Sequence, residues 1–550
     1  MFKLLVCLLS LLVISGFASA EQNLALGKPY RVDYPASSNY PDRNNKLTDG
    51  NYALANFLNP HWVGYSGRNH RIIVVDLENS YTIDRVVLGF TKDEPSGVLF
   101  PLAMSLATST NGIDWEVVST NYYPTKDMPT RISQRTTLEL DGKGQEARYV
   151  AVKFDIGVWV FVDEIEVFGP ETPVAANTGP SHLSQVNFDQ LNRVFGKFFT
   201  EELYHSIDSD HQRVSEETGF ARDIMLIYDQ FSGINWQESH ALPYVAYLNE
   251  DLEPVDWFFD TFLFLGLSAP GGRNFGAYNL ATKADWLWWL DRVFNPGHGF
   301  DAFESAVKFA GEKLGDPDHK VKVIVMIPNP SEVSAYPFDP DNPFYLTSNR
   351  VGRQAAAENR FNVVKWYIEE FEKRFQAREY EHLELIGYYW LSENATLYGI
   401  EGDYLPRVGD YIREKGLRFF WIPYFMAAGY SQWKEAGFDA VMLQPNYMFH
   451  LDKDNSRLLR AAIEAKTYSM GLEFEASPDV LIITEQRERY YDYLRTAVTL
   501  GYGNDILRGW YQDVKIFHDA ARSTWPEVRE VYDVTYKFVK GEYTETIKFE

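Results

Sequence analysis

Short apolar runs separated by turn residues fill the first third of the chain. HRIIVVDL, TIDRVVLGF, MSLATST, RYVAVKFD and DEIEVFG lie within residues 21 to 170, with Gly, Pro, Asn and Asp between them. Short strands punctuated by turn residues are typical of antiparallel sheets. The pattern therefore predicts an antiparallel β-sandwich over residues 21–170.

Residues 171–220 differ in composition from the segments on either side. They begin with ETPVAANTGPSHLSQ, which is rich in Pro, Ala, Thr and Gly, and continue with the amphipathic stretch FDQLNRVFGKFF. Such a composition is typical of a linker that leads into a helix. We interpret these residues as a tether and a lead-in helix between two domains.

After residue 220 continuous apolar runs alternate with amphipathic, helix-like stretches. The eight runs are residues 223–230, 257–266, 322–329, 383–390, 418–425, 439–447, 471–477 and 506–513. This alternation predicts a parallel sheet covered by helices, and eight units over residues 221–550 fit a closed (β/α)8 barrel. A doubly wound open sheet is the alternative, although GGRNFG at 271–276 lacks the glycine spacing of a dinucleotide site.

Polar and aromatic side chains occur where these runs end. In a barrel of this kind the functional site lies at the C-terminal mouth of the strands, so we expect the residues at the strand ends to face one cavity. They are Tyr228, Asp229, Asn329, Glu393, Asn394, Tyr424, Gln444, Asn446, Glu473, Glu475, Trp510, Tyr511 and Gln512. The rings that could stack on sugar faces, or simply fill the core, are Trp390, Trp421, Tyr424 and Trp510.

Two of the acids, Glu393 and Glu475, follow the fourth and seventh runs, which face each other across a barrel mouth. Hydrolysis of a glycosidic bond needs one carboxyl to protonate the leaving oxygen and another to attack the anomeric carbon or activate water. We predict Glu393 as acid/base and Glu475 as nucleophile, with Asp229 orienting a sugar hydroxyl. Glu473 shares strand parity with Glu475, whereas Glu485 fits the first turn of a helix. The alternative is that these acids form ion pairs and do no chemistry.

Charge and composition narrow the class of partner. The formal charge is −25 and no Lys/Arg-rich stripe occurs, which argues against nucleic acid. Aromatic residues make up 16% of the chain, and their rings suit sugar faces as well as protein interiors. No run beyond the first twenty residues is long enough to span a bilayer. We therefore expect a polysaccharide or oligosaccharide partner, no nucleic acid and no membrane span.

The first twenty residues, MFKLLVCLLSLLVISGFASA, have the layout of a secretory signal that is cleaved after Ala20. The only cysteine, Cys7, lies inside it, so disulfides, thiolate zinc sites and a cysteine nucleophile are excluded from the released chain. We expect a secreted or periplasmic bacterial protein. The absence of a GxSxG motif argues against a serine nucleophile elbow, and the absence of HExxH and of clustered histidines argues against a zinc hydrolase. We expect no cofactor for catalysis.

The first domain resembles a known family. NLALGKPYRV, KLTDGNY, IIVVDL, TIDRVVL, SLATSTNGIDWEVV, ARYVAVKF and DEIEVFG follow, in order, the pattern of discoidin-like modules of the coagulation factor type C family. The resemblance implies a galactose-binding-like jelly roll; many bacterial members bind sugars through loops at one end and carry a structural calcium ion. It implies Asp49 with Glu164 or Glu166 as carboxylate ligands of Ca²⁺, completed by backbone carbonyls, although Asp49 could instead cap a turn. Candidate sugar contacts are His61, Trp62 and Arg68.

The second domain also shows two resemblances. Its layout is similar to the large glycosidase clan whose catalytic glutamates end strands four and seven, but here Ser392 precedes Glu393 where the clan usually has Asn. The stretch from DIMLIYDQFSG through YYWLSENA and LQPNYMF to GWYQD resembles a bacterial family known as domain of unknown function 4855, often joined to discoidin-like modules. This implies a secreted, glycan-processing context.

Together these observations predict a secreted bacterial glycoside hydrolase with a retaining mechanism and an accessory carbohydrate-binding type of sandwich. The alternative is a non-catalytic glycan-binding or cell-surface protein. Sugar identity, linkage, endo or exo action, retention or inversion at the anomeric carbon, glycan binding by the sandwich and oligomeric state are left open by the sequence.

Overall fold

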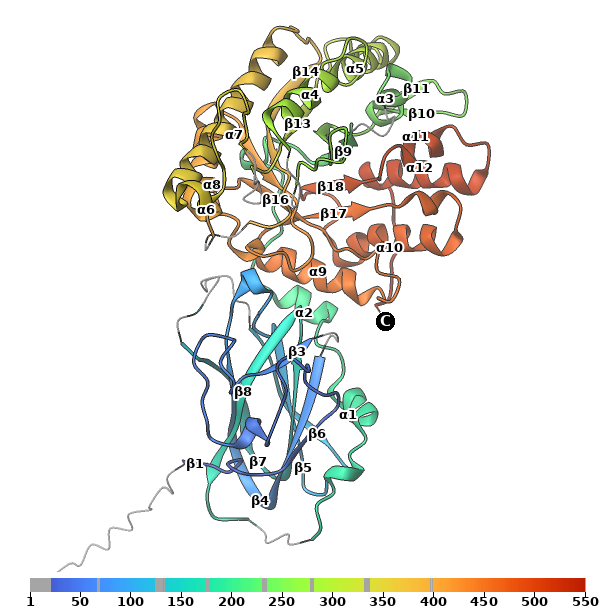
Figure 1. Ribbon diagram of the computed structural model, residues 1–550. Helices are drawn as coiled ribbons and strands as arrows, with labels where there is room; N and C mark the ends of the chain where they lie inside the picture. The colour runs from blue at the N-terminus through green and yellow to red at the C-terminus, as the bar shows by residue number, and fades with distance from the viewer. Residues whose placement is uncertain are drawn as a thin grey trace, which may run out of the picture. The chain divides into compact units, whose positions relative to one another are not determined.

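The computed structural model describes residues 21–549, except 67–69, 124–131, 133, 175–178, 230–234, 277–280, 331–336, 396 and 398. The predicted signal segment and Arg68 lie outside the described residues. The chain forms two compact units, one containing most residues up to Phe198 and the other Phe199–Glu550 (Figure 1). In the described part of the chain, no helix is both long and apolar enough to cross a membrane.

The first unit is an antiparallel β-sandwich. Its strands are β1 (Glu21–Asn23), β2 (Tyr30–Val32), β3 (Val63–Ser66), β4 (His70–Phe90), β5 (Ala103–Ser109), β6 (Glu116–Tyr122), β7 (Thr136–Asp155) and β8 (Trp159–Pro170). They are ordered β1-β8-β4-β7-β5-β6, with β2 on β4 and β3 on β8, and every pair is antiparallel. The predicted discoidin-like sandwich is confirmed.

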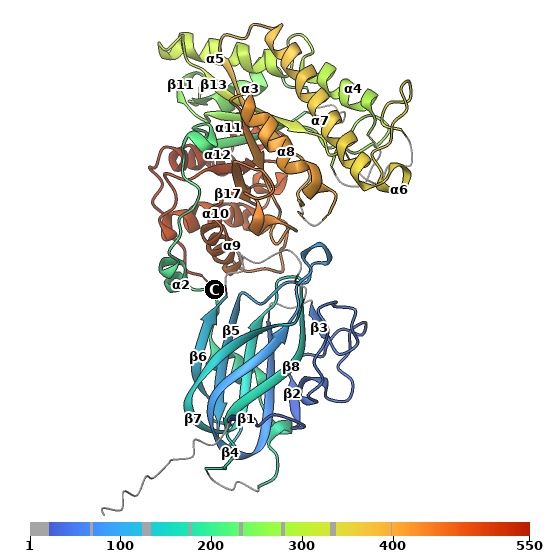
Figure 2. The same cartoon turned by 90° about the vertical axis from the view of Figure 1, so that its left-hand side faces the viewer.

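Two long strands, β4 and β7, run through both halves of this sandwich (Figure 2). The first half of β4 pairs with β2 and the end of β7, whereas its second half pairs with the start of β7 and with β8. The register shifts between Asp76 and Tyr81 and again between Ile83 and Arg85. These irregularities bend the ribbon, so two apolar runs that look separate in the sequence form one strand.

The predicted lead-in helix packs on the sandwich. It is α1 (Phe188–Phe195), and the Asn187 side chain caps its first turn by accepting from the Gln190 amide. Leu191 and Phe195 belong to the same buried cluster as Ile72, Val74, Ala107 and Tyr149. Residues 183–195 are therefore part of the sandwich core, and α2 (Glu201–Ser206) begins the second unit.

The second unit is a closed barrel of eight parallel strands. They are β9 (Asp223–Tyr228), β12 (Thr261–Leu265), β13 (Val321–Ile327), β14 (Leu383–Trp390), β15 (Arg418–Trp421), β16 (Ala440–Leu443), β17 (Gly471–Glu475) and β18 (Arg508–Tyr511). Neighbours along the chain pair in order, and β18 closes on β9. Each of the eight predicted runs overlaps one of these strands, so the prediction of a closed parallel barrel is confirmed.

Helices lie outside the barrel strands (Figure 1). They are α3 (Glu238–Val245), α4 (Lys283–Val293), α5 (Phe300–Leu314), α6 (Ser348–Val351), α7 (Arg353–Gln376), α8 (Glu401–Glu414), α9 (Ser456–Thr467), α10 (Thr484–Leu500), α11 (Ile516–Ala521) and α12 (Pro526–Val539). A short hairpin, β10 (Ala246–Leu248) and β11 (Pro254–Trp257), interrupts the series. Between β15 and β16 the chain forms only the 3-10 helix η5 (Tyr430–Gln432), which departs from regular (β/α)8 order.

Side-chain alternation along the strands separates the barrel interior from the helix layer. Phe474 of β17 stacks on Trp510 of β18 with ring centroids 4.8 Å apart, and both contact Phe538 of α12. These rings therefore face the helices. Because successive strand residues point to opposite faces, Glu473 and Glu475 on either side of Phe474 face the barrel interior.

Candidate functional site

Glu475 ends β17 and is buried, with 1% of its surface exposed. Its Oε2 accepts a hydrogen bond from the Tyr493 hydroxyl of α10. Burial raises the pKa of Glu475 to about 7. The Tyr493 hydrogen bond, the backbone amides of Tyr447 and Asn446 and the nearby Arg457 guanidinium oppose this rise, because each favours the ionised carboxylate. A buried acid with a pKa near neutrality and a fixed hydrogen-bond donor is suited to a catalytic role.

Glu473 lies two residues deeper on the same strand and has a different environment. It is 2% exposed, and no hydrogen-bond partner of its Oε1 occurs among the described residues. Burial, with the charges of Glu475 and then Glu393, raises its pKa well above the usual range. Space for this side chain depends on Gly509, where an added Cβ would lie 3.4 Å from Glu473 Cγ and 3.1 Å from a methionine sulfur.

Glu393 follows β14 and is exposed to solvent. Its Oε1 accepts from Gln444 Nε2 at 3.3 Å, and Gln444 also donates to the Ile422 carbonyl at 3.1 Å. The surrounding protein raises the pKa of Glu393 by desolvation, and the Gln444 hydrogen bond opposes this. The structure thus brings predicted residues of the fourth and sixth strands together at the mouth.

Three tyrosines and a phenylalanine connect the acids to the surface. Burial raises the pKa values of Tyr228, Tyr389 and Tyr511, and the charge of Glu393 contributes to each. The Tyr228 and Tyr511 rings meet edge to face with centroids 5.7 Å apart, and Tyr511 meets Phe449 at 5.5 Å. Phe449 is 47% exposed. The sequence did not indicate a role for Phe449 at the mouth, because Phe449 lies after β16 and beyond the predicted run 439–447.

Asp229 does not join this cluster. Its buried carboxylate forms an ion pair with Arg292 of α4, and its carbonyl accepts from Trp289 Nε1 at 3.0 Å. Burial raises the pKa of Asp229 to about 6, although Arg292 lowers it. The prediction that Asp229 orients a sugar hydroxyl is corrected, because the ion pair turns the side chain toward the helix layer.

The tryptophans chosen as stacking surfaces are all fully buried. Trp510 lies between the barrel and α12, and its Nε1 donates to Asp223 Oδ1 at 2.9 Å. Trp421 stacks on Phe438, and Trp390 packs against Tyr404 of α8. Predicting sugar contacts for these rings was wrong, because strand alternation places them among the helices. Tyr511 faces the opposite side of the same strand from Trp510 and keeps its predicted place.

The remaining predicted side chains lie near the mouth but carry structural bonds. Asn394 accepts from the Ala428 amide at 3.0 Å, and Tyr424 pairs with Gln444 in an isolated bridge. Asn446 adopts a left-handed backbone conformation, with φ of 53°, in the turn whose amides reach Glu475. Gln512 is buried and accepts from Tyr244 at 2.7 Å. Tyr493 and Arg457 were missed because they sit on helices rather than at strand ends.

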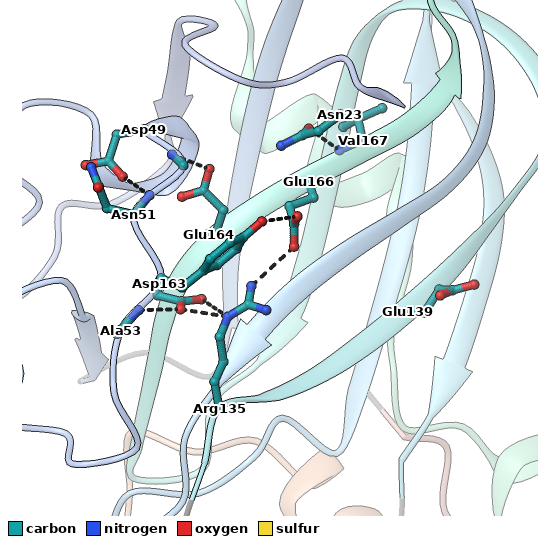
Figure 3. Close-up of polar contacts among 12 residues, drawn as sticks. Asn23, Asp49, Asn51, Ala53, Arg135, Glu139, Asp163, Glu164, Glu166 and Val167 are labelled. Carbon is teal, nitrogen blue, oxygen red and sulfur yellow. Dashed lines mark hydrogen bonds and ion pairs between the residues drawn. The ribbon is translucent and has the colours of Figure 1, made fainter. Parts of the chain in front are cut away.

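The sandwich holds a second group of acids, shown in Figure 3. Glu164 is fully buried; its Oε1 accepts from the Gly50 amide at 3.0 Å, and its Oε2 has no partner among the described residues. Burial raises the pKa of Glu164 to about 8, and the Asp49 charge adds to this. Asp49 itself accepts from the Asn51 amide at 2.8 Å, so it does cap a turn.

Glu166 is engaged differently from Glu164. Its carboxylate accepts from the Tyr52 hydroxyl at 2.7 Å and lies 3.3 Å from Arg135, which also pairs with Asp163 at 2.7 Å (Figure 3). Among the described residues no group of three or more His, Cys, Asp or Glu side chains is arranged to hold a metal ion. An ion at Glu164 would therefore need backbone oxygens as well as side chains.

One predicted sugar contact of the sandwich belongs to its core. Trp62 is 1% exposed, donates to the Leu54 carbonyl at 2.7 Å and packs in a cluster with Phe161. The prediction for Trp62 is corrected on this ground. His61 is half-buried, with its amide bonded to Asn59 Oδ1 at 3.1 Å.

Each of the two units matches the model of a known family. The model of the family described as "Domain of unknown function (DUF4855)" matches residues 223–537, and that of the "F5/8 type C domain" matches residues 33–165. The resemblances to the coagulation factor type C family and to domain of unknown function 4855 are confirmed. No curated protein matches the chain.

Several solved structures are similar to part of the chain. A Streptococcus pneumoniae fucose binding module is 23% identical, covers 26% of this chain and 94% of its own, and has a TM-score of 0.20. Chitosan-binding module 1 of a chitosanase/glucanase from Paenibacillus sp. IK-5 is 18% identical over 27% and 98%, with a TM-score of 0.19. The family 32 CBM from C. perfringens NanJ, solved with galactose, is 11% identical over 27% and 98%, with a TM-score of 0.20.

Proposed function

We propose that this chain is a glycoside hydrolase. It belongs to the family described as Domain of unknown function (DUF4855), because the model of that family matches more than half of the chain. Its proposed catalytic unit is the barrel, of the (β/α)8 type with one irregular connection, and its active site is the mouth where Glu393, Glu473 and Glu475 meet. The enzyme acts outside the cell or in the periplasm after its signal segment is removed.

One observation carries the proposal: the charges of acids from different strands of the barrel, Glu475 on β17 and Glu393 after β14, both raise the pKa of Glu473. Glu473 on β17 is influenced by the charges of both Glu475 and Glu393, and Tyr511 is influenced by all three. Charges act on one another in this way only at short range or through poorly screened protein. Carboxyl groups facing each other across a cavity are what glycosidic hydrolysis requires.

The roles proposed for Glu475 and Glu393 follow from the environments of the two acids. Glu475 is held by Tyr493 and by backbone amides and has a pKa of about 7, so it is ionised in neutral to alkaline solution and can attack an anomeric carbon. Glu393 is reached by solvent and has a raised pKa, which suits a group that gives a proton to the leaving oxygen and later takes one from water. This division gives a retaining mechanism.

The aromatic residues at the mouth support a sugar as the substrate. Tyr228, Tyr511 and Phe449 form a continuous edge-to-face series that ends at an exposed ring. Aromatic faces contact the apolar faces of sugar rings while a tyrosine hydroxyl can bond their hydroxyls. We place the glycan along this series, with the scissile bond beside Glu393.

The sandwich is proposed as an accessory glycan-binding module with a structural calcium ion. Its membership of the F5/8 type C family supports this. The unpartnered oxygen of buried Glu164, beside Asp49, fits a cation that would neutralise the pair. When bound, the ion would supply positive charge that holds the Asp49–Asn51 turn against β8; Glu166 is already occupied by Tyr52 and Arg135.

A non-catalytic glycan-binding barrel is the second candidate. It is favoured by the burial of Glu475, of which 1% is exposed and which Tyr493 already holds. A hydrolase must bring the anomeric carbon against this carboxylate, whereas a binding protein need not.

Digestion of a glycan panel separates the two candidates. The wild-type chain is expected to release reducing ends from at least one glycan, and Glu393→Gln to lose most of this activity because the leaving oxygen is no longer protonated. Glu485→Gln is the matched control, since Glu485 is an exposed acid in the first turn of α10. Equal release by all three proteins would remove Glu393 from the mechanism, and no release from any glycan would favour the binding protein.

A further inference from the structure

The Tyr493 hydroxyl makes three hydrogen bonds in a buried position. Its oxygen lies 3.2 Å from the Tyr447 amide nitrogen and 3.0 Å from the Met448 amide nitrogen, and it contacts Glu475 Oε2. Tyr493 is 3% exposed, and the amides belong to the turn that follows β16. The geometry therefore ties one phenol to a loop and to a carboxyl at once.

The donor count fixes the direction of the bond to Glu475. A backbone amide can only donate, so both amides direct their hydrogens at the Tyr493 oxygen, and the Tyr447 amide shares its hydrogen with Glu475. The phenol has one hydrogen of its own, and Glu475 is the acceptor in contact with it. If Glu475 donated instead, the Tyr493 oxygen would receive three hydrogens and its own would point at no acceptor, at a cost of a buried unsatisfied donor.

Glu473 has no hydrogen-bond donor among the described residues that compares with the Tyr493 hydroxyl at Glu475. Its Oε1 has no partner among the described residues, and the neighbouring barrel position is Gly509, which offers no side chain. A buried ionised carboxylate without a donor is costly, whereas a neutral carboxylic acid is far less so. The two acids lie on one face of β17, so two negative charges there would also repel each other.

We propose that Tyr493 is a positioning residue that keeps Glu475 a proton acceptor, and that Glu473 carries the single proton of the pair. The pair thus holds one negative charge, located on the carboxyl nearer the mouth. The catalytic meaning rests on the proposed function, but the protonation states exist without any substrate.

The groups that surround the pair agree with this arrangement. Glu475 faces the Arg457 guanidinium from α9 as well as Tyr493 from α10, both of which favour its ionised form. Among the described residues, the charges that act on Glu473 are those of Glu475 and Glu393, which favour its neutral form. The titratable groups around Glu473 are Glu393, Glu475, Tyr228, Tyr389 and Tyr511.

In the proposed reaction, a neutral Glu473 keeps the pKa of Glu475 from rising further. A second charge two residues away would raise the pKa of Glu475 and reduce the fraction that is ionised. The neutral neighbour avoids this rise. Its proton stays on Glu473 throughout, so it differs from the proton that Glu393 exchanges with the leaving group and water.

Infrared difference spectroscopy of the full chain tests the proposal without a substrate. In a Glu164→Gln background, which removes the buried sandwich acid whose pKa is about 8, the chain at about pH 8 is expected to show a protonated-carboxyl C=O band. This band should disappear when Glu473→Gln is added and persist when Glu475→Gln is added. Tyr493→Phe is expected to add a second such band, because Glu475 loses its donor and holds a proton at a higher pH. Isotope labelling of the glutamate carboxyls assigns the bands.

Two neighbouring tyrosines of α10 provide matched controls. Tyr491 has no partner for its hydroxyl among the described residues, and Tyr490 bonds Thr535, so Tyr491→Phe and Tyr490→Phe are expected to leave the carboxyl bands unchanged. Loss of the band in Glu475→Gln with retention in Glu473→Gln would overturn the assignment. So would the absence of a protonated carboxyl in the Glu164→Gln background at this pH. Either result leaves hydrolysis itself to be judged separately by the glycan panel.

Discussion

Replacing Glu164 with glutamine is expected to stabilise the sandwich in alkaline, calcium-free solution. Glu164 is fully buried, with one oxygen bonded to the Gly50 amide and the other without a described partner. Burial raises its pKa from the usual 4.5 to about 8. Glutamine keeps the shape of the side chain and removes the need to ionise it.

The magnitude follows from the shift in pKa. Each tenfold change in proton affinity corresponds to about 1.4 kcal/mol, so ionising Glu164 in the folded state costs at most about 5 kcal/mol. The folded-state pKa lies above that of the unfolded chain. The contribution is therefore complete below about pH 4.5 and is lost as the pH rises to about 8. Bound calcium would neutralise the carboxylate and remove this loss.

Urea unfolding of the full chain in chelator, from about pH 5 to about pH 8, measures the effect. The wild type is expected to lose stability across this range and to regain it with calcium, whereas Glu164→Gln should do neither. Glu139→Gln is the control, because Glu139 is an exposed acid of β7 and its loss should change stability by less than about 0.5 kcal/mol. Parallel pH dependence in the wild type and Glu164→Gln would refute the reasoning.

Three further predictions concern the barrel. Gly509→Ala places a Cβ 3.1 Å from Met442 Sδ and should lower the free energy of unfolding by about 1–3 kcal/mol in a denaturation assay. Gly503→Ala is the control, because its Cβ would meet no atom closer than 3.7 Å and should lower the free energy of unfolding less. Asp229→Asn should lower stability by about 3 kcal/mol, because the buried ion pair with Arg292 is lost; a change below about 0.5 kcal/mol would contradict this. Hydrolysis should fall as the pH drops through about 7, since Glu475 must be ionised, and a flat acid limb in kcat/KM would exclude it as nucleophile.

The architecture could be predicted because its signals are local. The apolar run 383–390 coincides with β14 to the residue, and the run 471–477 contains β17. Continuous apolar runs alternating with amphipathic stretches have few other solutions than a parallel sheet covered by helices. The absence of an α-helix between β15 and β16 was not predicted, because neither RFFWIPYF nor the run after it signals that turns connect these two strands.

The site was predictable only in part, because orientation depends on registers that the sequence does not contain. Glu473 and Glu475 were placed on one face by strand parity, and the outward packing of Phe474 agrees with this. The same parity assigns Trp510 and Tyr511 to opposite faces, so naming both as sugar contacts could not be right. Tyr493 reaches Glu475 from a helix, and no strand-end rule finds such a residue.

The central claim is that Glu475 attacks the sugar, and trapping the glycosyl-enzyme tests it most directly. The full chain is incubated with activated 2-fluoro glycosides whose sugars match the glycan that it cleaves, and labelled peptides are identified by mass spectrometry. The account predicts a single covalent label on Glu475, absent in Glu475→Gln. A label on Glu393 or Glu473, or hydrolysis of the same glycan with inversion and no label, would contradict it.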